Sequence, residues 1–175
     1  MVCPLPESRH ATSFLNVNRM NIKDIEVHRE DIGSKVASGL IRALNAELSA
    51  RYHEPGANHF RLDADEVAAG RGAFLVAYVG VTPVGCGAIR RLDCDTAEIK
   101  RMYVDPATRG YGVGRTLLTR LEAEARSLGV KRVVLETGAR QPEALALYTR
   151  AGFSRIPAFG EYLGSALSVC MGKTL

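Results

Sequence analysis

Glycines occupy alternate positions in a short segment that ends on an arginine, Arg109-Gly110-Tyr111-Gly112-Val113-Gly114-Arg115. Where such a segment leads into a helix, the first N–H groups of the helix lack intrahelical partners and carry partial positive charge. Glycine lets the backbone come close to a ligand that a Cβ would hold away. The segment therefore indicates a site for phosphate or pyrophosphate, with an ordinary tight turn into a helix as the alternative.

The residues around this loop predict the strand and the helix that would position it. Residues 97–104 alternate in the manner of a strand, which places Glu98, Lys100, Met102 and Val104 on one face and Ile99, Arg101 and Tyr103 on the other. The run Arg115–Leu128 carries leucines and alanines at helical spacing, and Gly129 stands where a glycine cap belongs.

The rest of the chain predicts further strands and helices of an α/β domain. Before the loop, we expect strands at Ile22–Glu30, Gly72–Val81 and Val84–Arg91, a helix after the N-cap Ser34 and a short helix at Asp63–Ala69. After it, we expect a strand at Val130–Glu136, a helix from Pro142 and a final strand at Ser168–Met171. This order predicts a mixed sheet flanked by helices. Residues 1–21 are expected to form a loose arm, and residues 22–175 a single domain.

Composition and charge favour a small ligand over a polymer. Hydrophobic residues make up 46% of the 175 residues and charged residues 24%, which is ordinary for a soluble globular protein. The net charge is +4, and the basic residues are interleaved with acids. That distribution favours a small anionic ligand and argues against nucleic acid as a partner. Residues 1–19 lack the apolar core of a signal peptide, and no apolar run is long enough to span a membrane. We therefore expect a cytoplasmic protein with no membrane partner.

The cysteines predict neither a metal site nor a nucleophile. Cys3, Cys86, Cys94 and Cys170 form no Cys-x-x-Cys pair and have no ligand spacing with the histidines. We expect inert thiols in a reducing compartment. Because no histidine is placed to activate Cys86 or Cys94, nucleophilic catalysis by cysteine is not expected.

Together and in this order, these segments resemble the GNAT superfamily of N-acetyltransferases. The spacing Arg109-x-x-Gly112-x-Gly114 is similar to the pyrophosphate loop of the family, and residues 97–104 are similar to its central strand. Leu147–Phe153 resembles a second signature, in which a tyrosine stands four residues before Gly-Phe. The clear resemblance covers Phe74–Phe153. It implies the GNAT acyl-CoA N-acyltransferase fold, with acetyl-CoA as co-substrate and no metal.

The resemblance implies which residues bind coenzyme A. The N–H groups of the glycine loop would hold the pyrophosphate, with Arg109 and Arg115 nearby for charge. Met102, Tyr103 and Val104 would offer backbone groups to the pantetheine arm, and Tyr148 would also line the coenzyme A site. Many members carry an asparagine after the next strand; this chain departs from that pattern, and Gln141 is the candidate replacement.

The resemblance also implies residues for the chemistry. Acetylation requires the amine to lose a proton, the thioester oxygen to gain negative charge and the sulfur to leave protonated. Glu98 is the candidate base, acting through water, unless it is only a surface or salt-bridged glutamate beside Lys100; Glu136 is the alternative carboxylate. The backbone N–H of Met102, at a bulge typical of the family, is the candidate oxyanion donor. Tyr148 is the candidate general acid, with a core-facing aromatic as the alternative.

The resemblance implies that the acceptor is a primary amine of a small molecule or peptide. In this family, the pocket comes from the first helices and the C-terminal hairpin, here Tyr52–Phe60 and Phe159–Tyr162. Tyr52, Arg61, Phe159 and Tyr162 are lining candidates that could equally be packing residues. An amino acid, a polyamine, an aminoglycoside or a protein N-terminus would all be compatible. The alternative function is a non-catalytic acyl-CoA-binding regulatory module. Many members form homodimers, an assembly that no feature of this sequence specifies.

Overall fold

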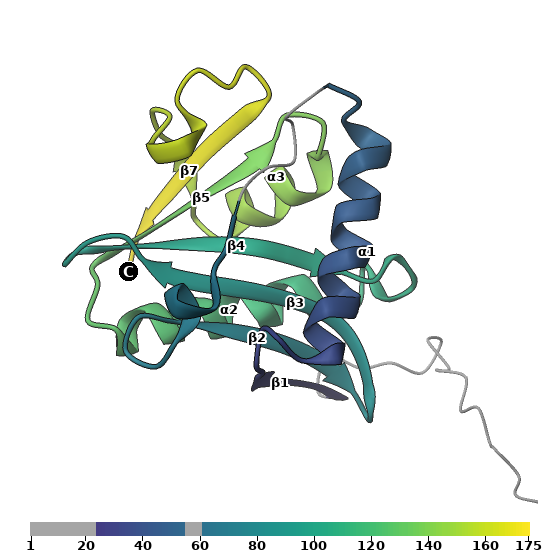
Figure 1. The fold of residues 1–175 in the computed structure, drawn as a ribbon. Coiled ribbons are helices and arrows are strands. Elements are labelled where there is room, and N and C mark those ends of the chain that lie inside the picture. The colour runs from purple at the N-terminus through teal and green to yellow at the C-terminus, as the bar shows by residue number, and fades with distance from the viewer. Residues whose placement is uncertain (1–23, 55–60) are drawn as a thin grey trace, which may run out of the picture.

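The computed structural model describes residues 24–54 and 61–175, in which the strands form one sheet with helices on both faces (Figure 1). The strands are β1 (Ile25–Arg29), β2 (Gly72–Val79), β3 (Thr82–Arg91), β4 (Thr96–Val104), β5 (Arg132–Gly138), β6 (Ser154–Arg155) and β7 (Ser168–Thr174). The α-helices are α1 (Lys35–Arg51), α2 (Val113–Ser127) and α3 (Pro142–Arg150). The predicted arm at residues 1–21 lies outside the described residues.

The sheet is mixed, as the order of elements predicts. Its strand order is β1-β2-β3-β4-β5-β7-β6, and every neighbouring pair is antiparallel except β4 and β5. Most predicted elements are found within two or three residues of their expected bounds. The short helix expected at Asp63–Ala69 is a 3-10 helix at Ala64–Val67. The strand β6 was not predicted, because two residues carry no alternation.

Apolar side chains fix which helix covers which face. Ala37, Leu40 and Leu44 of α1 join a cluster with Phe74 and Val76 on one face of the sheet. The leucines of α2 and Tyr148 of α3 join the larger cluster on the other face. The helix α1 begins where Ser34 caps it, since the Ser34 hydroxyl accepts the N–H of Ala37 at 3.1 Å.

A bulge in β4 overturns part of the predicted face assignment. Cys86 pairs with Tyr103 while Ala88 pairs with Lys100, so β4 has one residue more than β3 at this point. Arg101 has a φ of 56° there. The extra residue reverses the alternation: Met102 and Val104 pack with Ile99 against the α2 cluster, and Tyr103 packs on the α1 side. The prediction that Met102 and Val104 share a face with Glu98 is therefore wrong.

Strands β4 and β5 diverge beyond a short paired region. Their parallel pairing runs from Thr96 opposite Arg132 to Ile99 opposite Leu135. The bulge follows directly in β4, and in Figure 1 the two strands separate towards the end of the sheet near α1. Side chains and backbone from both strands are thus available to line a site there.

Candidate active site

A cleft of about 470 Å³ lies between α1, the end of β4, the glycine loop and α3. Every residue that the resemblance assigned to coenzyme A lines it except Tyr111, namely Met102, Tyr103, Val104, Arg109, Gly110, Gly112, Val113, Gly114, Arg115, Gln141 and Tyr148. The helix α1 adds Leu44, Glu47, Leu48 and Arg51. These four residues were not predicted, because the sequence does not show which face of α1 meets the loop.

The glycine loop has the geometry that its sequence predicts. Gly110 and Gly112 have φ angles of 88° and 93°, a region that a Cβ makes costly. Gly112 is the N-cap of α2, so the first N–H groups of the helix begin directly at the cleft. Gly114 packs under α3, where a Cβ would lie 3.2 Å from the Leu147 side chain. The loop therefore combines free donors, helix dipole and close packing, which suits a bound phosphate group.

Charged side chains around the loop are of both signs. Arg109 donates from Nε to the Val104 carbonyl at 3.0 Å, and its Nη2 lies 2.5 Å from Glu47 Oε2. The other Glu47 oxygen lies 2.9 Å from Arg51 Nη2. Glu47 thus bridges two arginines at the cleft, and the carboxylate of α1 lies where an anionic ligand would compete for Arg109.

A second cavity of about 90 Å³ adjoins the cleft. The two cavities share Leu44, Leu48, Met102, Gln141 and Tyr148. On its own side the second cavity is lined by Ile99, Lys100, Arg101, Glu136, Thr137 and Tyr162. Met102 at the bulge and Tyr148 on α3 therefore stand between a cleft suited to a phosphate-bearing ligand and a smaller polar cavity.

Tyr148 is buried, and its hydroxyl is protonated at ordinary pH. Its side chain is 5% exposed, and its ring lies tilted against Phe153 with centroids 5.9 Å apart. Burial, and to a lesser extent the charge of Glu136, raises the pKa of Tyr148 well above the usual tyrosine range. The phenol is thus neutral at ordinary pH and able to donate a proton.

Glu136 is the carboxylate that borders the second cavity. It is half-buried near the end of β5, and burial raises its pKa above the usual glutamate range. A carboxylate with a raised pKa is the stronger base once it is ionised. The position of Glu136 near the end of β5, where β4 and β5 diverge, accounts for both its partial burial and its raised pKa.

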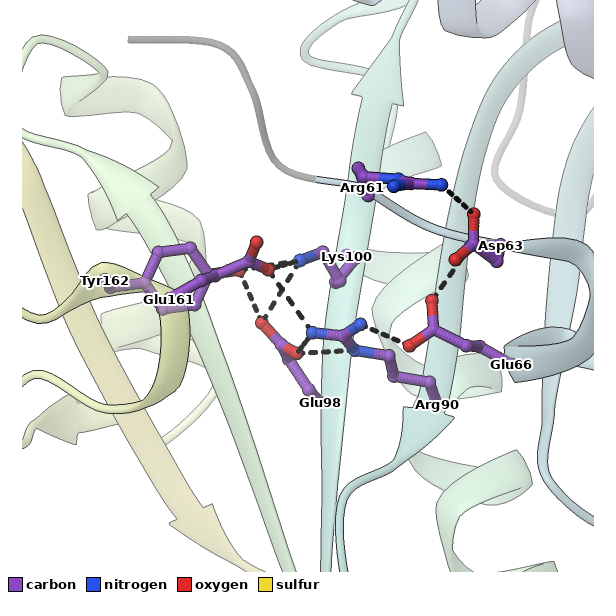
Figure 2. A network of polar contacts seen from close by, with 8 residues as sticks. All are labelled: Arg61, Asp63, Glu66, Arg90, Glu98, Lys100, Glu161 and Tyr162. Carbon is purple, nitrogen blue, oxygen red and sulfur yellow. Dashed lines mark hydrogen bonds and ion pairs between the residues drawn. The ribbon is translucent and has the colours of Figure 1, made fainter. Parts of the chain in front are cut away.

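Glu98, the predicted base, lines neither cavity and is completely buried. Glu98 Oε2 accepts a hydrogen bond from Arg90 Nε at 2.8 Å and lies 2.7 Å from Arg90 Nη2. Glu98 Oε1 accepts a hydrogen bond from the Tyr162 hydroxyl at 2.5 Å. Figure 2 shows how Arg90 and Glu98 lie at the centre of a polar network that reaches the C-terminal segment. Glu98 is thus salt-bridged, as in the alternative interpretation of this residue. Its closer cation is Arg90, and Lys100 Nζ lies 3.8 Å from Glu98 Oε1.

The network joins three distant parts of the chain. Arg90 Nη1 lies 2.5 Å from Glu66 of the 3-10 helix, and Glu161 contacts both Arg90 and Lys100 (Figure 2). The Arg90–Glu98 contact had a signal in the sequence, because the two residues face each other across the predicted hairpin. Glu66 and Glu161 had none, since each reaches the site through tertiary packing.

The predicted acceptor residues separate into two groups. Tyr162 lines the second cavity. Tyr52 lines neither cavity; its hydroxyl accepts the Arg140 N–H at 3.0 Å and braces the turn before α3. Phe159 packs edge-on against Tyr162 at 5.2 Å, and Arg61 pairs with Asp63 at 3.4 Å. Residues 55–60 of the predicted Tyr52–Phe60 segment lie outside the described residues.

Cys86, one of the two cysteines considered as a nucleophile, is buried. Burial raises the pKa of the Cys86 thiol to about 12, so it is protonated at neutral pH. Within residues 24–54 and 61–175, no group of three or more His, Cys, Asp and Glu side chains is arranged to hold a metal ion. Over the same residues, no helix has the length and apolar character needed to cross a membrane.

A loop suited to an anion, a protonated phenol and a carboxylate surround the two adjoining cavities, and acyl transfer to an amine can use each of these groups. The fold and the site thus define an acyltransferase. The sequence model of the Acetyltransferase (GNAT) family matches residues 37–153, and the chain belongs to that family.

Individual relatives agree with this assignment. The chain is 38% identical to an "IAA acetyltransferase" of Azospirillum brasilense over 154 residues, 87% of this chain and 99% of the relative. A solved structure from Klebsiella pneumoniae, described as an acyl-CoA N-acyltransferase, is 34% identical with a TM-score of 0.75, covering 86% of this chain and 97% of that one. An Elizabethkingia anophelis GNAT acetyltransferase solved with acetyl-CoA bound shares the fold, at 18% identity and a TM-score of 0.61, covering 87% of this chain and 99% of that one. The protein is thus an acetyltransferase, and its co-substrate is a coenzyme A thioester.

Proposed function

We propose that this acetyltransferase moves the acetyl group of acetyl-CoA to a primary amine of a small molecule or peptide, by direct attack of the amine on the thioester. The observation that carries the proposal is the pair of adjoining cavities with Met102 and Tyr148 between them. A donor in the larger cleft and an acceptor in the smaller cavity would meet at these two residues.

The larger cleft fits acetyl-CoA in its chemistry. The N-terminus of α2 and the positive-φ glycines offer donors to the pyrophosphate, and Arg109 and Arg115 supply charge. The apolar side chains of α1 and α3 suit the pantetheine arm. Once bound, acetyl-CoA supplies the thioester that the amine attacks. The bulge re-aims the backbone at Met102, which supports its N–H as a donor to the thioester oxygen.

The position of Tyr148 supports its role as general acid, because it lines both cavities and keeps its proton. For the base, contact with the acceptor cavity supports Glu136 over Glu98. Glu98 would then act as a positioning residue, since it holds Tyr162 at 2.5 Å and shapes the cavity from behind.

The test is transfer itself. The purified chain is incubated with acetyl-CoA and a panel of primary amines, and both free thiol and the acetylated amine are measured. The proposal expects one mole of thiol for each mole of acetylated amine. Acetyl-CoA binding with no product from any amine would instead favour the non-catalytic module.

A further inference from the structure

Positive charge is unevenly neutralised along the wall of the larger cleft. Its cationic side chains are four arginines, Arg51, Arg109, Arg115 and Arg150. Its two glutamates, Glu47 and Glu143, both lie against Arg51, and Glu47 also contacts Arg109. Within residues 24–54 and 61–175, no carboxylate contacts Arg115 or Arg150, and both side chains are exposed. These two arginines are therefore available to an anionic group of a ligand in the cleft.

Arg115 lies where a helix is not stabilised by a cation. It is in the first turn of α2, directly after Gly114, and this turn contains no acidic residue. The N-terminus of a helix carries partial positive charge, so a cation there is unfavourable unless an anion lies beside it. The pyrophosphate proposed for the glycine loop would be that anion, because Arg115 directly follows the loop.

Arg150 reaches the cleft from a different helix. It is the last residue of α3 and follows Leu147 by one turn. A Cβ on Gly114 would lie 3.2 Å from the Leu147 side chain, so this face of α3 packs beside the glycine loop. Arg150 lines the larger cleft and does not line the smaller cavity. A cation in the last turn of a helix also suits the helix dipole, which is the alternative role of Arg150.

Acetyl-CoA carries phosphate in two places. Its pyrophosphate joins the pantetheine arm to the ribose, and a separate phosphate monoester is attached to the 3′ carbon of that ribose. A phosphate monoester has about 1.5 to 2 negative charges at neutral pH, because its second pKa is about 6. Since the ribose separates the two groups, a cation for the monoester must lie beside the glycine loop and not within it. Arg150 meets this requirement, and its guanidinium can give a phosphate two parallel hydrogen bonds.

We propose that Arg150 binds the ribose 3′-phosphate of acetyl-CoA, and that this contact selects acetyl-CoA over donors that lack the phosphate. The inference rests on the proposed use of acetyl-CoA as the donor. It assigns Arg115 and the glycine loop to the pyrophosphate and Arg150 to the 3′-phosphate, so replacing the two arginines should have different effects.

Two donors that differ only in the 3′-phosphate test the inference, namely acetyl-CoA and acetyl-3′-dephospho-CoA. The Kd of each is measured by calorimetry without an amine. Wild-type protein should bind acetyl-CoA about 10-fold tighter, the lower range for a charged hydrogen bond, because Arg150 is exposed. Arg150→Gln should bring the two Kd values to within about twofold of each other, and Arg150→Lys should keep part of the difference.

Two further arginines serve as comparisons. Arg115→Gln should weaken the binding of both donors alike and keep the ratio of their Kd values, because both donors carry the pyrophosphate. Arg120→Gln is the matched control, since Arg120 is exposed on α2 and lies outside the cleft. That change should leave both Kd values as in wild type.

The outcomes separate this inference from the proposed function. Equal Kd values of the two donors in wild type overturn the inference and leave transfer to amines standing. A ratio that Arg150→Gln leaves unchanged overturns the role of Arg150, and a lower melting temperature in that variant would then support the helix-dipole role. Wild-type protein that acetylates no amine but keeps the ratio overturns the proposed function and leaves the inference standing. Failure to bind acetyl-CoA overturns both. If Arg150→Gln does not fold, the wild-type ratio and Arg150→Lys decide.

Discussion

Tyr148 is both buried and part of the wall of the two cavities. Because burial raises its pKa, the phenol remains protonated throughout the range in which enzymes are usually assayed. Both features agree with a group that gives a proton to a leaving thiolate.

Replacing Tyr148 by phenylalanine should lower kcat by about 100-fold, the lower range for the loss of a general acid. The ring remains, so its packing against Phe153 should survive. In the wild type, activity should decline only at a pH above the ordinary tyrosine pKa of about 10, where Tyr148 loses its proton. A pH–rate profile measures both effects. An unchanged kcat for Tyr148→Phe at every pH would exclude the acid role.

The two carboxylates should respond to substitution in different ways. As the proposed base, Glu136 must be ionised, so activity should rise with pH through a pKa above the usual glutamate value of about 4.3. Glu136→Gln should abolish that rise and lower kcat by about 10²–10⁴-fold. Glu98→Gln should mainly destabilise the fold, by about 1–3 kcal/mol, because it removes one of the three carboxylates that contact Arg90 and places a neutral amide in a buried network.

Kinetic pH profiles and urea unfolding of both variants measure these effects. Glu98 would be the base if Glu98→Gln were as stable as wild type but no longer showed the rise of activity with pH, while Glu136→Gln still showed it.

At the scale of the elements, the glycine loop depends on the left-handed backbone at the start of α2. Gly112→Ala places a Cβ at a φ of 93°, which should cost about 1–2 kcal/mol of stability and distort the N–H groups at the helix start. We expect acetyl-CoA binding to weaken at least 10-fold by calorimetry. Gly39→Ala is the control, since Gly39 is an exposed helical residue with no atom within 4 Å of an added Cβ. That change should leave binding intact; equal affinity in both variants would refute the role of the loop.

The contact between α1 and the loop should restrain acetyl-CoA binding. Glu47 lies 2.5 Å from Arg109, so a phosphate group must compete with its carboxylate for the same guanidinium. Glu47→Gln should tighten acetyl-CoA binding by about 3-fold to 10-fold, roughly 1 kcal/mol. The gain should shrink at high salt. Glu26→Gln, exposed on β1, is the matched control. Weaker binding by Glu47→Gln would show that Glu47 supports the cleft instead.

The sequence predicts local features of these elements well. Glycine at positive φ, serine at the N-cap of α1 and leucines at helical spacing are rules of local conformation, and each is confirmed. The faces of β4 were predicted wrongly past Lys100, because a single extra residue reverses the alternation. The family resemblance predicted a bulge at Met102, which the structure confirms, but the residue types of the strand gave no sign of it.

At the scale of the whole molecule, the limits of the sequence are those of long-range packing. The cleft was predicted where neighbouring residues build it, and the contributions of Glu47, Leu44 and Leu48 were missed because α1 lies far away in the chain. The same holds for Glu161, which reaches Lys100 from a segment 61 residues later. Nothing in the local pattern around Glu98 distinguishes a catalytic carboxylate from the centre of an ion network.

The central claim is that one donor cleft and one acceptor cavity meet at Met102 and Tyr148. Single-turnover transfer tests it most directly: protein saturated with acetyl-CoA is mixed with an amine, and the acetylated amine is quantified by mass. We predict one acetyl group transferred per bound acetyl-CoA, at a rate that falls about 100-fold in Tyr148→Phe while acetyl-CoA stays bound. The claim would be contradicted if acetyl-CoA bound but its acetyl group passed to no amine. Transfer by Tyr148→Phe at the same rate as by wild type would contradict it too.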